Sequence, residues 1–183
     1  QNITVSVTDV DDVAPVFTSG ATYSAAENQT SIGTVTATDV DTDNGSITFT
    51  VSGTDASSMS INSSTGVLAF ISSPDYETKT SYTAIVTVTD GSNSTAQNIT
   101  VSVNNLNDNL PVFTSSANLS ANENQTVIGT ITASDADGNN LSYAVAGTDA
   151  SSMSINSSTG ALAFTSSPDY ETKTSYTAIV TVT

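Results

Sequence analysis

The sequence repeats itself in two long copies. QNITVSVTDVDDVAPVF at 1–17 returns as QNITVSVNNLNDNLPVF at 97–113, and residues 53–89 return at 147–183 with two changes. These offsets of 96 and 94 residues exceed the period of most solenoid repeats. Each copy is therefore expected to bury a core of its own, and the repeat predicts tandem domains.

Within a copy, apolar residues alternate with Ser and Thr, as in strands that bury one face. SYTAIVTVT at 81–89 and NITVSV at 98–103 show this most clearly. Gly, Asn, Asp and Ser turns separate the strands, and no segment has a helical period. We predict an all-β fold of two tandem seven-stranded Greek-key β-sandwiches.

The boundaries of the two copies do not coincide with the ends of the chain. Residues 1–13 correspond to a last strand and linker, residues 14–109 to repeat 1, and residues 110–183 to repeat 2. The segment DGSNSTA at 90–96 has no second copy, and the strand after it returns only at 1–7, so repeat 2 is expected to lack its last strand within this chain. We predict that residues 1–7 complete the second sandwich of an identical subunit end to end, or that the segment is one period of a longer filament.

Composition excludes several functions. The chain has 18 acidic residues, two lysines, no Arg, no His, no Cys and a formal net charge of -16. A nucleic-acid partner would find no basic surface, and no disulfide is possible. No apolar run reaches the roughly 18 residues of a membrane span. Without His, Cys, Arg or a nucleophile-elbow motif, we predict that the chain is not an enzyme.

The acidic residues are confined to short motifs at strand ends. Fifteen of the 18 lie in AEN, DVD, DYE, VTDG and the two boundary segments, or in their second-copy counterparts. Asp43, Asp55 and Asp149 are the exceptions. The boundary segment NLNDN could be a polar linker with turn chemistry alone, but the other motifs argue against that interpretation.

On these motifs, in this order and in two copies, the sequence resembles the cadherin repeat family. The resemblance covers nearly the whole chain and implies Ca²⁺ bound where successive repeats join. Calcium takes six to eight oxygen ligands, and packed carboxylates repel one another unless a cation lies among them.

The resemblance assigns the ligands of the internal junction. A first ion would be held by Glu27, Asp75, Glu77 and Asp108. A second would share three of these and add Asn105, the Leu106 carbonyl and Asp137. A third would use Asn107, Asp135, Asp137, the Asn109 carbonyl and a carbonyl near Asn139 or Asn140. Asn105 stands where the family usually has Asp, which leaves occupancy of the middle site open.

Two further half-sites follow from the same motifs. At the upstream boundary the expected ligands are Asp9, Asp11, Asp12, Asp39, Asp41 and Asp90. In the second copy Glu123, Asp169 and Glu171 correspond to Glu27, Asp75 and Glu77, and they are expected to meet residues 9–12 of a neighbour.

The predicted function is that of a calcium-rigidified structural or adhesive segment of a long extracellular repeat protein, secreted or at the cell surface. The alternative is a carbohydrate-binding module with a polysaccharide or cell-surface ligand, which would usually use exposed aromatic residues. The near-identity of the copies and the scarcity of lysine suggest a bacterial source. The adhesive partner and the total number of repeats stay open.

Overall fold

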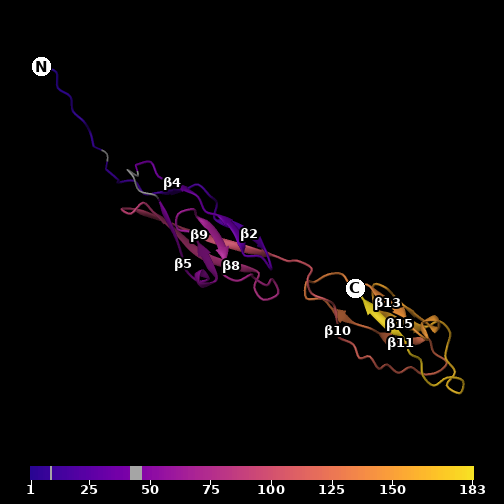
Figure 1. Ribbon diagram of the computed structural model, residues 1–183. Coiled ribbons are helices and arrows are strands. Elements are labelled where there is room, and N and C mark those ends of the chain that lie inside the picture. The colour runs from indigo at the N-terminus through magenta and orange to yellow at the C-terminus, as the bar shows by residue number, and fades with distance from the viewer. Residues whose placement is uncertain (9, 42–46) are drawn as a thin grey trace. The chain divides into compact units, whose positions relative to one another are not determined.

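The computed structural model describes residues 1–8, 10–41 and 47–183 (Figure 1). The chain divides into two compact units, unit 1 at Gln1–Leu106 and unit 2 at Asn107–Thr183. Across the described ranges the regular structure is β-strand together with two 3₁₀ turns, η1 at Ala56–Ser58 and η2 at Ala150–Ser152. The predicted all-β class is confirmed.

Unit 1 is a sandwich of two main sheets. Its strands are β1 (Val16–Phe17), β2 (Thr22–Ala26), β3 (Ser31–Thr34), β4 (Ala37–Thr38), β5 (Thr48–Ser52), β6 (Met59–Ile61), β7 (Val67–Phe70), β8 (Ser81–Thr89) and β9 (Ser94–Asn104). One sheet has the order β2-β9-β8-β5, and its four strands are labelled in Figure 1. The other sheet has the order β3-β7-β6, and β1 pairs with β4. β1 and β2 are two segments of the first strand of the sandwich, and β3 and β4 are two segments of the second strand. Seven strands therefore appear as nine segments.

Strand β9 is central to the larger sheet. It pairs antiparallel with β8, from Ser81↔Ser102 to Thr89↔Ser94, and parallel with β2, from Thr22↔Thr100 to Ala26↔Asn104. Both of its edges are therefore hydrogen-bonded. The parallel pairing joins the beginning of the repeat to its end.

The core of unit 1 lies between the sheets, where the alternation predicted it. Ile99, Val101 and Val103 of β9 are 1%, 0% and 4% exposed, and Val86 and Val88 of β8 are fully buried. Thr100 and Ser102 face solvent. Burying a β-branched side chain of this kind contributes about 1.5–3 kcal/mol, so these two strands carry much of the stability of unit 1.

Unit 2 repeats part of this pattern. Its strands are β10 (Val112–Phe113), β11 (Val127–Thr130), β12 (Ala133–Ser134), β13 (Tyr143–Ala146), β14 (Met153–Ile155), β15 (Ala161–Phe164) and β16 (Ile179–Val182). They form the pairs β10-β12 and β13-β16 and the sheet β11-β15-β14. Among the described residues of unit 2 no strand takes the place of β9, as the sequence predicts. The buried cluster is correspondingly small: Ile131, Tyr143 and Leu162.

Candidate metal centre

Four carboxylates gather at one end of unit 1, and we call them the upstream acidic cluster: Asp11, Asp39, Asp41 and Asp90. They come from three segments, since Asp11 precedes β1, Asp39 and Asp41 follow β4, and Asp90 follows β8. Antiparallel and crossing strands bring these ends together, although the segments are far apart in sequence. Asp9, also predicted as a ligand, lies outside the described residues.

One oxygen of each carboxylate is fixed by a hydrogen bond. Asp41 Oδ2 accepts the backbone N–H groups of Asp12 and Val13, both at 2.9 Å. Asp90 Oδ1 accepts those of Ser92 and Asn93, at 2.7 and 2.6 Å. Asp39 Oδ1 accepts the N–H of Asp41 at 3.1 Å, and Asp11 Oδ2 accepts the Ser92 hydroxyl at 3.1 Å. The loops thereby hold the four side chains in set orientations.

The second oxygen of each carboxylate is buried and has no hydrogen-bond partner within the part of the chain that the structure describes. These atoms are Asp11 Oδ1, Asp39 Oδ2, Asp41 Oδ1 and Asp90 Oδ2. A buried acceptor without a partner destabilises the fold, and it does so more strongly when it is charged. Four of them in one cluster match the hard, oxygen-rich donor set that Ca²⁺ prefers.

The electrostatics of the cluster agree with this geometry. Burial raises the pKa of Asp11, the Ser92 hydroxyl opposes the shift, and the charges of Asp90, Asp41 and Asp39 raise it further. The backbone N–H of Asp12 lowers the pKa of Asp41, which keeps that carboxylate ionised. The carboxylates therefore repel one another, and a divalent cation would relieve the repulsion.

A second acidic group lies at the opposite end of the same sandwich, in the loops after β2 and before β8. Glu27 is 1% exposed, and its two oxygens accept the backbone N–H groups of Leu106 at 2.7 Å and Tyr76 at 2.8 Å. Asp75 accepts the Thr78 hydroxyl at 2.8 Å, the largest cause that lowers its pKa, and the N–H of Glu77 at 3.0 Å, which lowers it further. Glu77 itself is exposed.

Unit 2 contains the counterparts of the acidic residues at both ends of unit 1. Asp137 Oδ2 accepts the N–H groups of Asp108 at 3.2 Å and Asn109 at 2.9 Å, and the Asp137 N–H bonds Asp135 Oδ1 at 2.9 Å. The arrangement repeats that of Asp41 in unit 1. The predicted ligands Asn105, Asn107 and Asn139 are exposed.

At the other end of unit 2, one carboxylate oxygen from each of Glu123, Asp169 and Glu171 lies within 4.8 Å of the other two. All three side chains are exposed. Glu123 Oε2 accepts the Tyr170 N–H at 3.2 Å, and the Thr172 hydroxyl, as the largest cause, lowers the pKa of Asp169. The structure thus brings these three carboxylates of unit 2 together.

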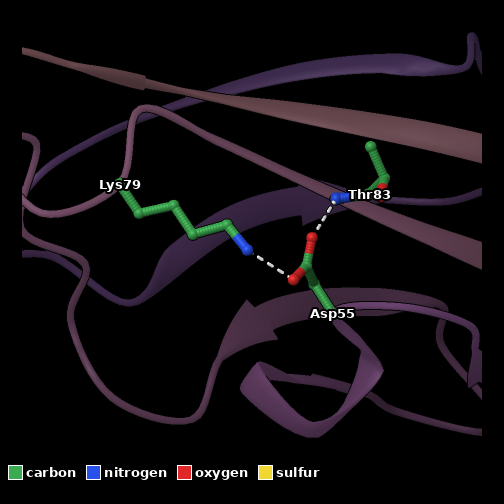
Figure 2. Close-up of polar contacts among 3 residues, drawn as sticks. All are labelled: Asp55, Lys79 and Thr83. Atoms are coloured by element: carbon green, nitrogen blue, oxygen red, sulfur yellow. Dashed lines mark hydrogen bonds and ion pairs between the residues drawn. The ribbon is translucent and has the colours of Figure 1, made fainter.

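Two acidic residues outside the motifs have a different role, which sequence reasoning missed. Asp55 forms an ion pair with Lys79 and accepts the Thr83 N–H at 2.8 Å (Figure 2). The Lys79 ammonium lies 4.5 Å from the centre of the Tyr82 ring. Asp149, Lys173 and Tyr176 repeat the set in unit 2. The signal was present, since each lysine follows its aspartate by 24 residues in both copies.

Comparisons with known proteins match this chain to cadherin domains. The cadherin domain family model matches residues 20–104. Human protocadherin Fat 1 is 34% identical over 196 residues, which cover 97% of this chain and 4% of that protein. The chain thus spans a small part of the curated relative that it matches.

Solved structures match the fold. The protocadherin gammaB7 EC3-6 cis-dimer structure matches with a TM-score of 0.81 and 27% identity, covering 98% of this chain and 50% of that one. The protocadherin gamma B2 extracellular cadherin domains 3-6 match with a TM-score of 0.72 and 27% identity, covering 89% and 45%. None of the described segments forms a helix long and apolar enough to cross a membrane.

Proposed function

Since this chain belongs to the cadherin repeat family, we propose that it is a calcium-stiffened structural or adhesive segment of an extracellular protein. The matching domains of protocadherin gamma B2 are extracellular, which supports an extracellular or cell-surface location here. The repeat boundaries at 13/14 and 109/110 and the bacterial source belong to the same proposal.

The observation that carries the proposal is the set of four buried carboxylate oxygens without hydrogen-bond partners in the described part of unit 1. Asp11, Asp39, Asp41 and Asp90 would hold Ca²⁺ there, with Asp9 and Asp12 on the same linker. The bound ion would supply positive charge and fill the coordination of these oxygens. The loops already supply the orientation, because one oxygen of each carboxylate is anchored.

At the internal junction the proposed ligands rest on the family resemblance. On the side of unit 1 they are Glu27, Asp75, Glu77, Asn105 and Leu106. On the side of unit 2 they are Asn107, Asp108, Asn109, Asp135, Asp137 and Asn139. Each unit fastens its own part of the linker, since Glu27 accepts the N–H of Leu106 and Asp137 accepts that of Asn109. Calcium bound by these residues would restrict bending at the linker.

The carbohydrate-binding alternative has less support. The exposed rings of Phe113 and Tyr170 could contact sugars, but this alternative gives no role to the buried carboxylate oxygens of the upstream acidic cluster. A pull-down on polysaccharides tests this alternative directly.

Calcium titration of the full chain by calorimetry tests the proposed function. Asp41→Asn and Asp90→Asn keep a hydrogen-bonding oxygen for the loop and place an amide N–H₂ where the ion would bind. We expect each to weaken binding at the upstream cluster by at least about tenfold, since a charged ligand is lost. Asp55→Asn is the matched control and should leave the calcium affinity unchanged. A chain that binds no calcium, or equal losses in all three variants, would refute the assignment.

A further inference from the structure

Ser92 lies in the turn between β8 and β9 and contacts two members of the upstream acidic cluster. Its backbone N–H donates to Asp90 Oδ1 at 2.7 Å, and its hydroxyl donates to Asp11 Oδ2 at 3.1 Å. Ser92 follows Asp11 by 81 residues in the sequence. One neutral residue therefore joins two carboxylates that come from distant segments of the chain.

The turn that carries Ser92 is held by hydrogen bonds of its own. The Thr89 hydroxyl donates to the Asn93 carbonyl at 2.6 Å and accepts the Gly91 N–H at 3.1 Å. The Asp90 N–H donates to the same carbonyl at 3.3 Å, and Asp90 Oδ1 accepts the Asn93 N–H at 2.6 Å. The turn therefore fixes the position of Ser92.

Asp11 is the member of the cluster that depends most on a contact of this kind. Asp41 and Asp90 each accept two backbone N–H groups, and Asp39 accepts one. Among the described residues, the Ser92 hydroxyl is the one hydrogen-bond donor to the Asp11 carboxylate. The other three carboxylates repel Asp11. Without the hydroxyl, the side chain of Asp11 would be free to turn away from the cluster.

The backbone around Asp11 is held separately. Asp41 Oδ2 accepts the N–H groups of Asp12 and Val13, both at 2.9 Å. The side-chain N–H of Asn93 donates to the Asp11 carbonyl at 3.5 Å, which is a long contact. These contacts orient the main chain of the linker, and the Ser92 hydroxyl orients the Asp11 side chain.

The two hydrogen bonds of Ser92 also decide which carboxylate oxygens stay available. They occupy Asp11 Oδ2 and Asp90 Oδ1. The remaining oxygens, Asp11 Oδ1 and Asp90 Oδ2, are buried and have no hydrogen-bond partner in the described part of the chain. An ionised carboxylate that accepts a hydrogen bond at one oxygen can still offer the other to a cation.

We propose that Ser92 is a positioning residue of the upstream acidic cluster, whose hydroxyl holds the Asp11 side chain in place before calcium binds. This role rests on the proposed function. Ser92 is not one of the proposed ligands, so it acts through Asp11. Ligands that are already ordered lower the entropy that binding must otherwise remove. The affinity for calcium therefore depends on a residue that has no charge and is not a ligand.

Calcium titration of the full chain, followed in proton–nitrogen NMR spectra, tests this role. The amide signals of Asp12 and Val13 report on the upstream acidic cluster separately from the other acidic groups. Ser92→Ala removes the hydroxyl and keeps the backbone N–H that binds Asp90. Ser92→Thr keeps a hydroxyl and is the conservative variant. Ser94→Ala is the matched control, at an exposed serine of the same hairpin.

We expect Ser92→Ala to weaken calcium binding at the upstream acidic cluster by about threefold to tenfold, because one hydrogen bond to a charged group is lost. Ser92→Thr should restore the affinity to within about twofold, and Ser94→Ala should leave it unchanged. The restoration distinguishes the hydroxyl from a general effect of substitution in the turn. Unchanged affinity in Ser92→Ala, or an equal loss in Ser92→Thr, would overturn the proposal.

A second readout needs no calcium. Three-bond couplings measured in excess chelator report the χ1 rotamer of Asp11. We expect a single rotamer in the unaltered chain and in Ser92→Thr, and averaging over the staggered rotamers in Ser92→Ala. Averaging already present in the unaltered chain would contradict the positioning role.

The two readouts separate this role from the function proposed above. If the unaltered chain and Ser92→Ala bind calcium equally well at the upstream acidic cluster, only the role of Ser92 is wrong. If the Asp11 rotamer depends on the Ser92 hydroxyl but the unaltered chain binds no calcium, the proposed function is wrong and the contact is structural alone.

Discussion

Glu27 accepts the backbone N–H of Leu106 at 2.7 Å and so ties the loop after β2 to the exit of β9. The second oxygen of Glu27 accepts the Tyr76 N–H at 2.8 Å, and the side chain is 1% exposed. A buried carboxylate is costly unless its oxygens are hydrogen-bonded, and here both are. Glu27 therefore stabilises unit 1 before any calcium is considered.

We predict that Glu27→Gln destabilises unit 1 even when chelator removes calcium. The amide nitrogen of Gln would face one of the two backbone N–H donors, so one buried hydrogen bond is lost. The expected cost is about 1.5–3 kcal/mol. Thermal unfolding in excess chelator measures it.

Glu123→Gln is the matched control, because Glu123 is the counterpart of Glu27 but is exposed in unit 2. A change within about 0.5 kcal/mol is expected there. Equal effects of the two substitutions would mean that the Leu106 and Tyr76 hydrogen bonds do not stabilise unit 1.

Calcium should control the stiffness of the chain more than its folding. The core of unit 1 is built from β-strand side chains such as Val86 and Ile99, while the acidic residues lie in loops at the ends. Removing calcium should therefore leave the β-sheet signal of circular dichroism nearly unchanged and alter the radius of gyration. X-ray scattering of the full chain at low concentration, with and without chelator, measures this change. An unchanged radius of gyration would contradict calcium stiffening.

Most of unit 1 could be predicted from the sequence because its strands bury one face only. The alternation in SYTAIVTVT gave the bounds of β8 and its buried residues Ala84, Val86 and Val88. The acidic motifs were found in the same way, since Asp and Glu stand at strand ends and not within the apolar runs. Here the local pattern and the three-dimensional arrangement agree.

The parallel pairing of β2 with β9 could not be predicted from the pattern. Alternation shows which face of a strand is buried but not which strand lies beside it. The break between β1 and β2 could not be predicted from the pattern either. The N–H groups of Thr18 and Ser19 donate to the Thr36 carbonyl, which places β1 beside β4 and leaves β2 to pair with β9. These contacts depend on residues distant in sequence.

Acid should lower the free energy of unfolding of unit 1, in part because it protonates Asp55. The hydrogen bond from Lys79 is the largest cause that lowers the pKa of Asp55, and the Thr83 N–H adds to it. A group with a lowered pKa in the folded state stabilises the fold above its unfolded pKa of about 3.9. That contribution is lost as the pH falls through the lower, folded pKa.

Asp55→Asn should therefore be less stable than the unaltered chain at pH 6, and the difference should shrink below about pH 4. Urea unfolding across this range, in chelator, measures the difference. The same comparison with Asp149→Asn tests the equivalent ion pair in unit 2, where the Lys173 hydrogen bond lowers the pKa of Asp149. A difference that stays constant with pH would show that the ion pair does not contribute.

Gly160 is required by space as well as by backbone conformation. Its φ is +70°, and a Cβ atom built there would lie 2.0 Å from the Ile131 carbonyl oxygen. The Ile131 N–H bonds the Gly160 carbonyl at 2.9 Å, so neither segment can move away without losing that hydrogen bond. Gly160→Ala should lower the free energy of unfolding by about 3 kcal/mol or more.

Gly138, in the same unit, has a φ of +76° but nothing within 4 Å of a built Cβ. Gly138→Ala should therefore cost only the conformational energy of about 1–2 kcal/mol. Denaturant unfolding of unit 2 in chelator compares the two variants, and equal losses would show that the Ile131 carbonyl can give way.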